Sequence, residues 1–140
     1  YYSHNTLILS RGADKMASVF DEITFRPDEP VFQQLIGFVK AQIVSGTLRD
    51  GDEVPSRRLL AARLGINPMT VQKAYRQMED DGYLETRPNQ GSRIRLTGTM
   101  RDRIREELFR DHVQSYIQAA KSMGLDRDAA AKLVEERWNT

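Results

Sequence analysis

The chain has 140 residues, 39% of them hydrophobic, with 21 basic and 20 acidic side chains and no cysteine. The lack of cysteine excludes disulfides, thiolate zinc sites and a cysteine nucleophile from these residues, and it fits a reducing compartment. No apolar run approaches the ~20 residues that cross a bilayer. We therefore expect a cytoplasmic protein without membrane contact.

The net charge of +1 hides an uneven distribution. Residues 56–95 hold 8 basic and 4 acidic side chains, residues 1–55 hold 5 and 8, and residues 96–140 hold 8 of each. A local basic excess is typical of a surface that binds phosphate. Ordinary variation along a chain produces such an excess about as often, so the charge alone leaves both interpretations open.

Residues 1–15 differ from the rest of the chain. Their apolar stretch, Leu7–Leu9, is too short for the core of a signal peptide. We interpret residues 1–15 as an extension or tag that is poorly ordered. Beyond them, polar and apolar residues alternate over Asp21–Phe25, which predicts a short edge strand.

The first long helix is predicted to begin with Pro30 as its first residue. Proline suits that position because its missing N–H has no intrahelical partner there, and Gly46 is typical of the position after a helix. Residues 47–54 are predicted to form a turn. The apolar positions of the helix are Val31, Leu35, Phe38, Val39 and Ile43.

Two shorter helices follow, separated by residues 64–67. Ser56 is a natural N-cap for the first of them, which Gly65 ends. Asn67 followed by Pro68 is a strong start signal for the next, which extends to Asp81 before Gly82. The residues predicted to face inward are Leu59, Leu60 and Leu64 in one helix and Val71, Ala74, Tyr75 and Met78 in the other.

A hairpin completes this segment. Short strands are predicted over Tyr83–Arg87 and Ser92–Leu96, around a turn at residues 88–91. Two helices joined by a short turn and followed by a hairpin indicate a helix-turn-helix with a wing, a shape that fits the DNA major groove. The expected fold class is mainly α with a small β wing, and the expected domain spans residues 16–97.

Residues 98–140 are expected to form a two-helix dimerisation region. A long amphipathic helix is predicted over Met100–Met123, Gly124 breaks it, and Asp126 caps a last helix. Two helices cannot bury their own apolar faces, so they must pack on the rest of the chain or on a second copy. The candidate dimerisation residues are Ile104, Leu108, Val113, Tyr116, Ile117, Ala120, Leu133 and Trp138. Tyr116 and Trp138 could instead line a pocket for a small-molecule effector, although packing is the favoured interpretation.

The helix over Asn67–Asp81 would lie in the major groove. Gln72 suits a bidentate pair with adenine, Thr70 suits a phosphate or a thymine methyl, and Arg at 57 or 58 suits guanine. Lys73 and Arg76 are expected to hold phosphate, and Arg93 and Arg95 could also follow it. The candidate DNA-binding residues are Ser56, Arg57, Arg58, Asn67, Met69, Thr70, Gln72, Lys73, Arg76, Arg87, Gln90, Gly91 and Ser92. Each alone has a simpler interpretation as part of a solvated polar surface.

Residues from about 30 to 96 resemble the DNA-binding domain of the GntR family of bacterial transcription regulators. The matching residues are Gly46, Leu48, Gly51, Pro55, Ser56, Arg58, Leu60, Ala61, Leu64, Gly65, Ile66, Thr70, Val71, Ala74, Met78 and Gly82. The resemblance implies that Arg58, rather than Arg57, reads a base, that Thr70 contacts DNA and that Gly91 belongs to the wing tip. Pro68 stands where many members have a DNA-contacting arginine, and Asn89 replaces a wing glycine.

Asn67–Tyr75 is similar to the YtrA-like branch of that family, whose members carry a short two-helix tail. The resemblance implies a homodimer that binds a palindromic operator as a repressor. A winged-helix module that binds proteins instead of DNA is the alternative. An enzyme is not expected, because the sequence has no phosphate-binding glycine loop, nucleophile elbow or HExxH motif. No cofactor or metal is expected, and the carboxylates of residues 79–81 are expected to be solvated and paired to a nearby arginine or lysine.

Overall fold

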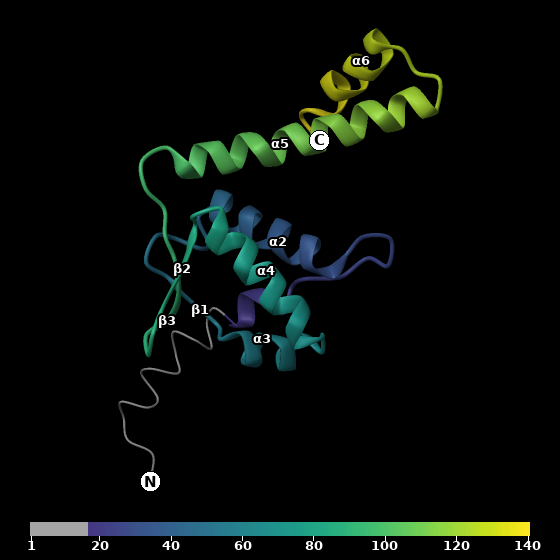
Figure 1. Ribbon diagram of the computed structural model, residues 1–140. Coiled ribbons are helices and arrows are strands. Elements are labelled where there is room, and N and C mark those ends of the chain that lie inside the picture. The colour runs from purple at the N-terminus through teal and green to yellow at the C-terminus, as the bar shows by residue number, and fades with distance from the viewer. Residues whose placement is uncertain (1–16) are drawn as a thin grey trace.

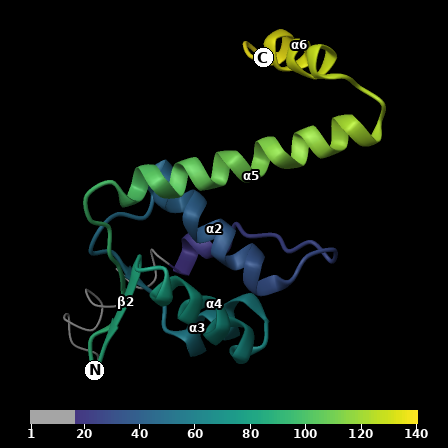
Figure 2. The ribbon, with the colours of Figure 1, turned by 45° about the horizontal axis from the view of Figure 1, so that its top comes forward.

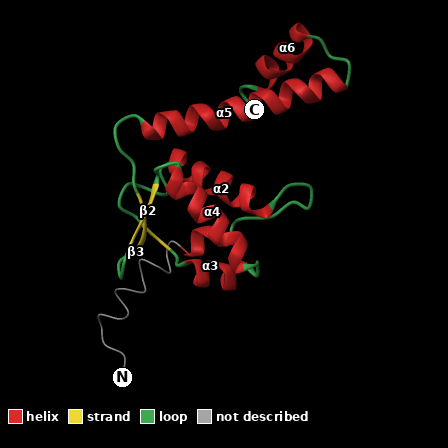
Figure 3. Cartoon of the chain, viewed as in Figure 1, coloured by secondary structure: helices red, strands yellow, loops and turns green. Residues whose placement is uncertain are grey.

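The computed structural model describes residues 17–140, so the interpretation of residues 1–15 as an extension lies outside the described part. Residues 17–20 are helical, and a three-stranded antiparallel sheet of order β1-β3-β2 lies beside the helices (Figure 3). The elements are α2 (Val31–Ser45), β1 (Glu53–Val54), α3 (Arg57–Leu64), α4 (Pro68–Asp80), β2 (Leu84–Arg87), β3 (Gly91–Ile94), α5 (Met100–Ser122) and α6 (Arg127–Arg137).

The helix boundaries follow from the local signals. Ser56 Oγ accepts the N–H of Leu59 at 3.1 Å, and Asn67 Oδ1 accepts the N–H of Met69 at 2.8 Å. These N-cap bonds satisfy donors that the first turn of a helix leaves free. Gly46 and Gly65 end α2 and α3 in the left-handed region, with φ of 84° and 65°. The predicted caps of α3 and α4 are therefore confirmed.

The predicted strand over Asp21–Phe25 is wrong. Residues 21 and 22 form a turn, and residues 23–26 are irregular. The backbone of Arg26 pairs with a side chain instead, because Gln34 accepts its N–H at 2.7 Å and donates to its carbonyl at 2.8 Å. Pro30 is the N-cap of α2 and not its first residue, since its ψ of 134° is extended.

An ion pair fixes this irregular segment to α3. The guanidinium of Arg63 donates to both carboxylate oxygens of Asp21, at 2.8 and 2.7 Å. The hydrogen bond from Arg63 lowers the pKa of Asp21 from its ordinary value. The pair joins residues 42 positions apart, which no local pattern indicates.

The sheet has a strand that the sequence did not predict. Residues 47–54 were expected to be only a turn, but Glu53 and Val54 pair with Arg93 and Ser92. Two residues are too few for an alternating pattern to appear. A hairpin between β2 and β3 is present as expected, although β3 covers Gly91–Ile94 and not Ser92–Leu96. Asn89 adopts a φ of 63° in its turn, which asparagine tolerates better than most residues.

The core lies between α2, α3, α4 and the sheet. Its largest fully buried side chains include Leu35, Ile43, Leu60, Val71, Tyr75, Met78, Tyr83 and Ile94. The inward face predicted for α4 is confirmed, because all four of its apolar residues are buried. Leu59 does not face inward as predicted, since it is 42% exposed while the neighbouring Leu60 is fully buried.

The apolar residues of α5 form two faces and not one stripe. Ile104 is 3% exposed and belongs to the core, and Leu108 packs against that core. Val113, Tyr116 and Ile117 are exposed. The separation follows from helix geometry, because nine residues at about 100° each turn half a revolution past the start. Ile104 and Leu108 are therefore used within the chain, and their assignment to dimerisation is corrected.

The far half of α5 and all of α6 extend away from α3 and α4 (Figures 1 and 2). The two helices touch where Tyr116 Oη donates to the carbonyl of Ala130 at 2.7 Å. No residue of α6 is fully buried, and Trp138 just beyond it is 80% exposed. None of the helices within residues 17–140 is both long and apolar enough to cross a membrane.

Removing the hydroxyl group is expected to have different effects on stability at the two buried tyrosines. Tyr75 Oη donates to the carbonyl of Pro55 at 2.5 Å, whereas the hydroxyl of Tyr83 is buried without a partner in the described structure. We expect Tyr75→Phe to lower the free energy of unfolding by about 1–3 kcal/mol, because it leaves a buried carbonyl unpaired. Tyr83→Phe is expected to be neutral or stabilising. Urea unfolding of both variants measures the difference, and equal losses would contradict the hydrogen-bond assignment.

Candidate nucleic-acid interface

The side of α4 that faces away from the core is polar and basic. We call it the recognition face and define it as Met69, Gln72, Lys73 and Arg76. Met69 is 71% exposed, Lys73 and Arg76 are exposed, and Gln72 is half-buried. Thr70 is half-buried at the helix N-terminus, beside this face. Side chains here can reach a groove because the buried residues of α4 hold its other side against α2 and α3.

Ser56 and Asn67 lie at the N-termini of α3 and α4. Both side chains are exposed, and their oxygens already accept capping bonds. A helix N-terminus attracts a phosphate through its partial positive charge and its free N–H groups. Both residues therefore define where α3 and α4 begin, and with that the position of the free N–H groups of each helix.

The adjacent arginines of α3 have different surroundings. Arg57 Nη2 lies 2.5 Å from Glu79 Oε1, and its guanidinium centre lies 5.4 Å from the centre of the Tyr75 ring. Arg58 is exposed. Because successive helical residues are about 100° apart, the contact of Arg57 with α4 leaves Arg58 on the outer side of α3. Of the two, Arg58 is the one whose guanidinium faces solvent.

Lys73 has a contact that the sequence did not indicate. Its Nζ lies 4.0 Å from the centre of the Phe32 ring in the first turn of α2. A cation–π contact at an exposed site contributes about 0.5–1 kcal/mol. It holds the ammonium group at the edge of the recognition face nearest to α2, while the side chain remains exposed.

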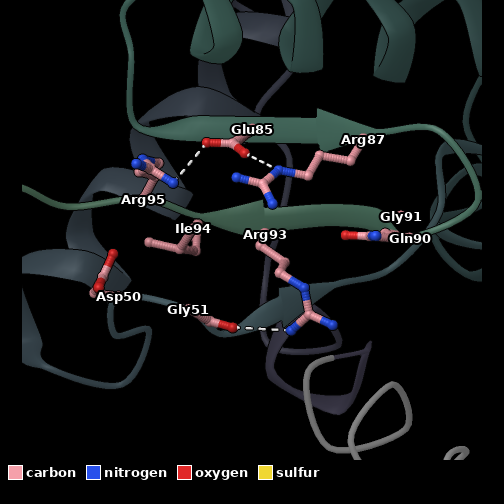
Figure 4. A pocket seen from close by; sticks show the side chains of 9 residues that line it. All are labelled: Asp50, Gly51, Glu85, Arg87, Gln90, Gly91, Arg93, Ile94 and Arg95. Atoms are coloured by element: carbon pink, nitrogen blue, oxygen red, sulfur yellow. Dashed lines mark hydrogen bonds and ion pairs between the residues drawn. The ribbon is translucent and has the colours of Figure 1, made fainter.

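Three arginines gather on one face of the wing around a hollow of about 200 Å³ (Figure 4). Arg95 Nη1 lies 2.9 Å from Glu85 Oε2, and Arg87 pairs with the other oxygen of the same carboxylate. Arg93 donates to the carbonyl of Gly51 at 3.2 Å. Asp50 also lines the hollow, so three guanidinium groups and two carboxylates surround it.

The opposite face of the wing points toward the protein. Ser92 is buried, and its hydroxyl lies 2.7 Å from that of Thr86 in β2. Gln90 and Gly91 are exposed at the turn, where Gly91 has a φ of 74°. Of the predicted wing residues, Arg87, Gln90 and Gly91 are thus accessible to a partner, whereas the side chain of Ser92 is not.

Two residues differ from the sequence prediction. Glu79 pairs with an arginine as expected, but its partner is the distant Arg57 and its side chain is only 31% exposed. A spacing of 22 residues gave no signal for that pair. Phe109 lies on the exposed apolar face of α5 with Val113 and Tyr116. Phe109, Val113 and Tyr116 recur at i, i+4 and i+7, a spacing that indicates a shared helix face and that includes Phe109 in it.

Comparison with known proteins adds independent findings. The profile of "Bacterial regulatory proteins, gntR family" matches residues 32–94. The chain is 30% identical over 104 residues to the uncharacterized HTH-type transcriptional regulator YhcF of Bacillus subtilis, covering 74% of this chain and 86% of that protein. It is 37% identical over 73 residues to the HTH-type transcriptional repressor YtrA of the same organism, covering 52% of this chain and 56% of that protein.

A solved structure shares the fold. A GntR family transcriptional regulator from Listeria monocytogenes superposes with a TM-score of 0.71 at 23% identity, covering 80% of this chain and 98% of the other. The likeness in fold thus extends over most of the chain. With the family match and the relative of similar length, it leaves no support for an enzyme. The chain belongs to the gntR family of bacterial regulatory proteins and is a DNA-binding transcription regulator.

Proposed function

We propose that this regulator binds a palindromic operator as a homodimer and represses transcription in the cytoplasm. The observation that carries the proposal is that exposed polar and basic side chains lie on three elements: the recognition face on α4, Arg58 on α3 and the arginines of the wing (Figure 4). In a winged helix these are the three elements that meet DNA. The likeness to the YtrA repressor supports repression over activation.

Within this proposal, each candidate has a role. Arg58 and Gln72 read bases, and Thr70 contacts a phosphate or a thymine methyl. Arg76, Lys73 and the wing arginines hold phosphates. Met69 packs against base edges, and the ends of α3 and α4 attract the backbone. Because Pro68 supplies no side-chain donor, specificity depends on Arg58, Gln72 and the wing.

The homodimer is supported by the exposed apolar residues of α5 and α6. They include Phe109, Val113, Tyr116, Ile117, Leu133, Val134 and Trp138. An apolar hollow of about 630 Å³ lies between the two helices and is lined in part by Tyr116, Ile117 and Ala120. We assign it to the helices of a second copy and not to an effector, because its lining continues into that exposed surface. A single module buries only about 600–1,000 Å² on DNA, so two linked modules bind far more tightly.

A salt-dependent gel shift tests DNA binding. The protein is mixed with DNA flanking its own gene at 50 and 200 mM salt. We expect a specific shift whose affinity falls steeply, by about 10³-fold or more if six or more phosphates are contacted. A reporter gene behind the shifted DNA is expected to lose expression when the protein is supplied. A binding module for proteins would give no salt-sensitive shift, and increased expression would indicate an activator.

A further inference from the structure

Arg57 contacts two residues of α4, Glu79 and Tyr75. Its Nη2 lies 2.5 Å from Glu79 Oε1, with side-chain exposures of 30% and 31% for the two residues. Its guanidinium lies over the Tyr75 ring, and its Nε is buried without a partner in the described structure. A partly buried ion pair with a hydrogen bond is stronger than one in free solvent. The guanidinium is therefore committed to contacts within the protein.

Tyr75 connects the same two helices at a second point. Its buried hydroxyl donates to the carbonyl of Pro55, which directly precedes the N-cap of α3. Burial raises the pKa of Tyr75, with a smaller opposing effect from Arg57, so the hydroxyl stays protonated and keeps donating. We call the set of Pro55, Arg57, Tyr75 and Glu79 the α3 clamp. It fixes the first turn of α3 on either side of Ser56.

We propose that Arg57 and Glu79 are positioning residues that aim Arg58 at its base, and that Arg57 itself does not contact DNA. The proposal rests on the proposed DNA binding. Arg58 follows Arg57 directly in the first turn of α3, so the rotation of that turn decides where its guanidinium points. A bidentate contact requires placement within about 0.5 Å and 10–20°. Fixing Arg57 on α4 supplies that precision, because α4 carries the recognition face.

The clamp explains why the two adjacent arginines have different roles, with Arg57 positioning the first turn of α3 and Arg58 contacting a base. An arginine that reads a base must be free to enter the groove, whereas one bound to a carboxylate must first break that pair. Arg57→Gln would therefore act through Arg58 and not through a lost phosphate contact. Its effect should appear in the discrimination between DNA sequences more than in the affinity for all sequences.

The test is a double-mutant cycle with Glu79→Gln, Arg57→Gln and the double variant. For each variant, the Kd is measured for the operator and for an operator in which the guanine read by Arg58 is replaced. The salt dependence of binding and the thermal midpoint of each variant are measured as well. We expect each single change to reduce discrimination about tenfold, a part of what one bidentate contact supplies. The double variant should lose no more than either single one, because both remove the same contact. Asp80→Asn, which removes a neighbouring exposed carboxylate, is the matched control and should leave discrimination unchanged.

The outcomes separate the clamp from its alternatives. Unchanged discrimination in Glu79→Gln would overturn the proposal while leaving DNA binding intact. A salt slope that flattens by about 0.9 in Arg57→Gln would show that Arg57 holds a phosphate, and it would overturn the proposal as well. A merely structural role would lower the thermal midpoint and weaken both DNAs equally. If the unaltered protein gives no salt-sensitive binding, the proposed function fails, and that result is distinct from all of these.

Discussion

Arg58→Ala is expected to remove most of the preference for one base position of the operator. Arg58 is the exposed arginine of the first turn of α3, and a bidentate arginine–guanine contact supplies about 1–3 kcal/mol of discrimination. The Kd for the operator should therefore rise about 5- to 150-fold, whereas the Kd for an operator already altered at that position should change little. Competition binding with a panel of single-base operator variants measures this.

Arg76→Ala is the matched comparison for Arg58. Arg76 is also exposed, but it lies in the middle of α4, where a phosphate contact is proposed. Its loss should weaken binding to all DNA sequences alike. It should also reduce the slope of log K against log salt concentration by about 0.9, the contribution of one phosphate contact. If Arg58→Ala behaves like Arg76→Ala, with sequence preference retained, then the assignment of Arg58 as the base reader is wrong.

Val113→Glu is expected to separate the dimer and with it most operator binding. Val113 is exposed on the apolar face of α5, and it is not among the residues of the winged-helix core. A carboxylate placed in an apolar interface must be desolvated without a partner, which costs several kcal/mol. Loss of the second module removes an avidity of about 10²-fold or more. Sedimentation should show a monomer at micromolar concentration, and the thermal midpoint of the winged helix should be preserved.

Gln118→Glu adds the same charge to the other side of α5. Gln118 is exposed, and at about 100° per residue it lies some 140° around the helix from Val113. This variant should remain a dimer and keep its affinity for the operator. A monomeric unaltered protein, or equal dissociation of both variants, would refute the apolar face of α5 as the interface.

The sequence predicted the elements that local signals define. Ser56, Asn67 and Gly65 mark helix ends through bonds or backbone angles that involve residues at most four positions away. The buried face of α4 repeats at helical spacing, so it was also predictable. The sequence alone thereby indicated a helix-turn-helix with a wing, and its motif indicated the family that the comparisons confirm.

Other features were decided by contacts between distant residues. The edge strand at Glu53 exists because Arg93, 40 positions later, offers a pairing partner. Asp21–Phe25 pairs with no strand within residues 17–140, and it is held by Arg63 at Asp21 and by Gln34 at the following Arg26. The sequence predicts one long amphipathic helix over Met100–Met123, and its spacing does not distinguish a face that packs on the core from an exposed one. Only packing against the core shows that Ile104 belongs inside and that Val113 does not.

The sequence by itself determined that the chain presents a recognition helix with two arginines before it and a basic hairpin after it. It did so because caps, helical periodicity and turn residues act over a few positions. The tertiary structure decided which arginine is paired within the protein, since the partner of Arg57 is Glu79 on another helix. Side-chain roles of this kind depend on which distant groups pack together, and that is fixed only when α3 lies against α4.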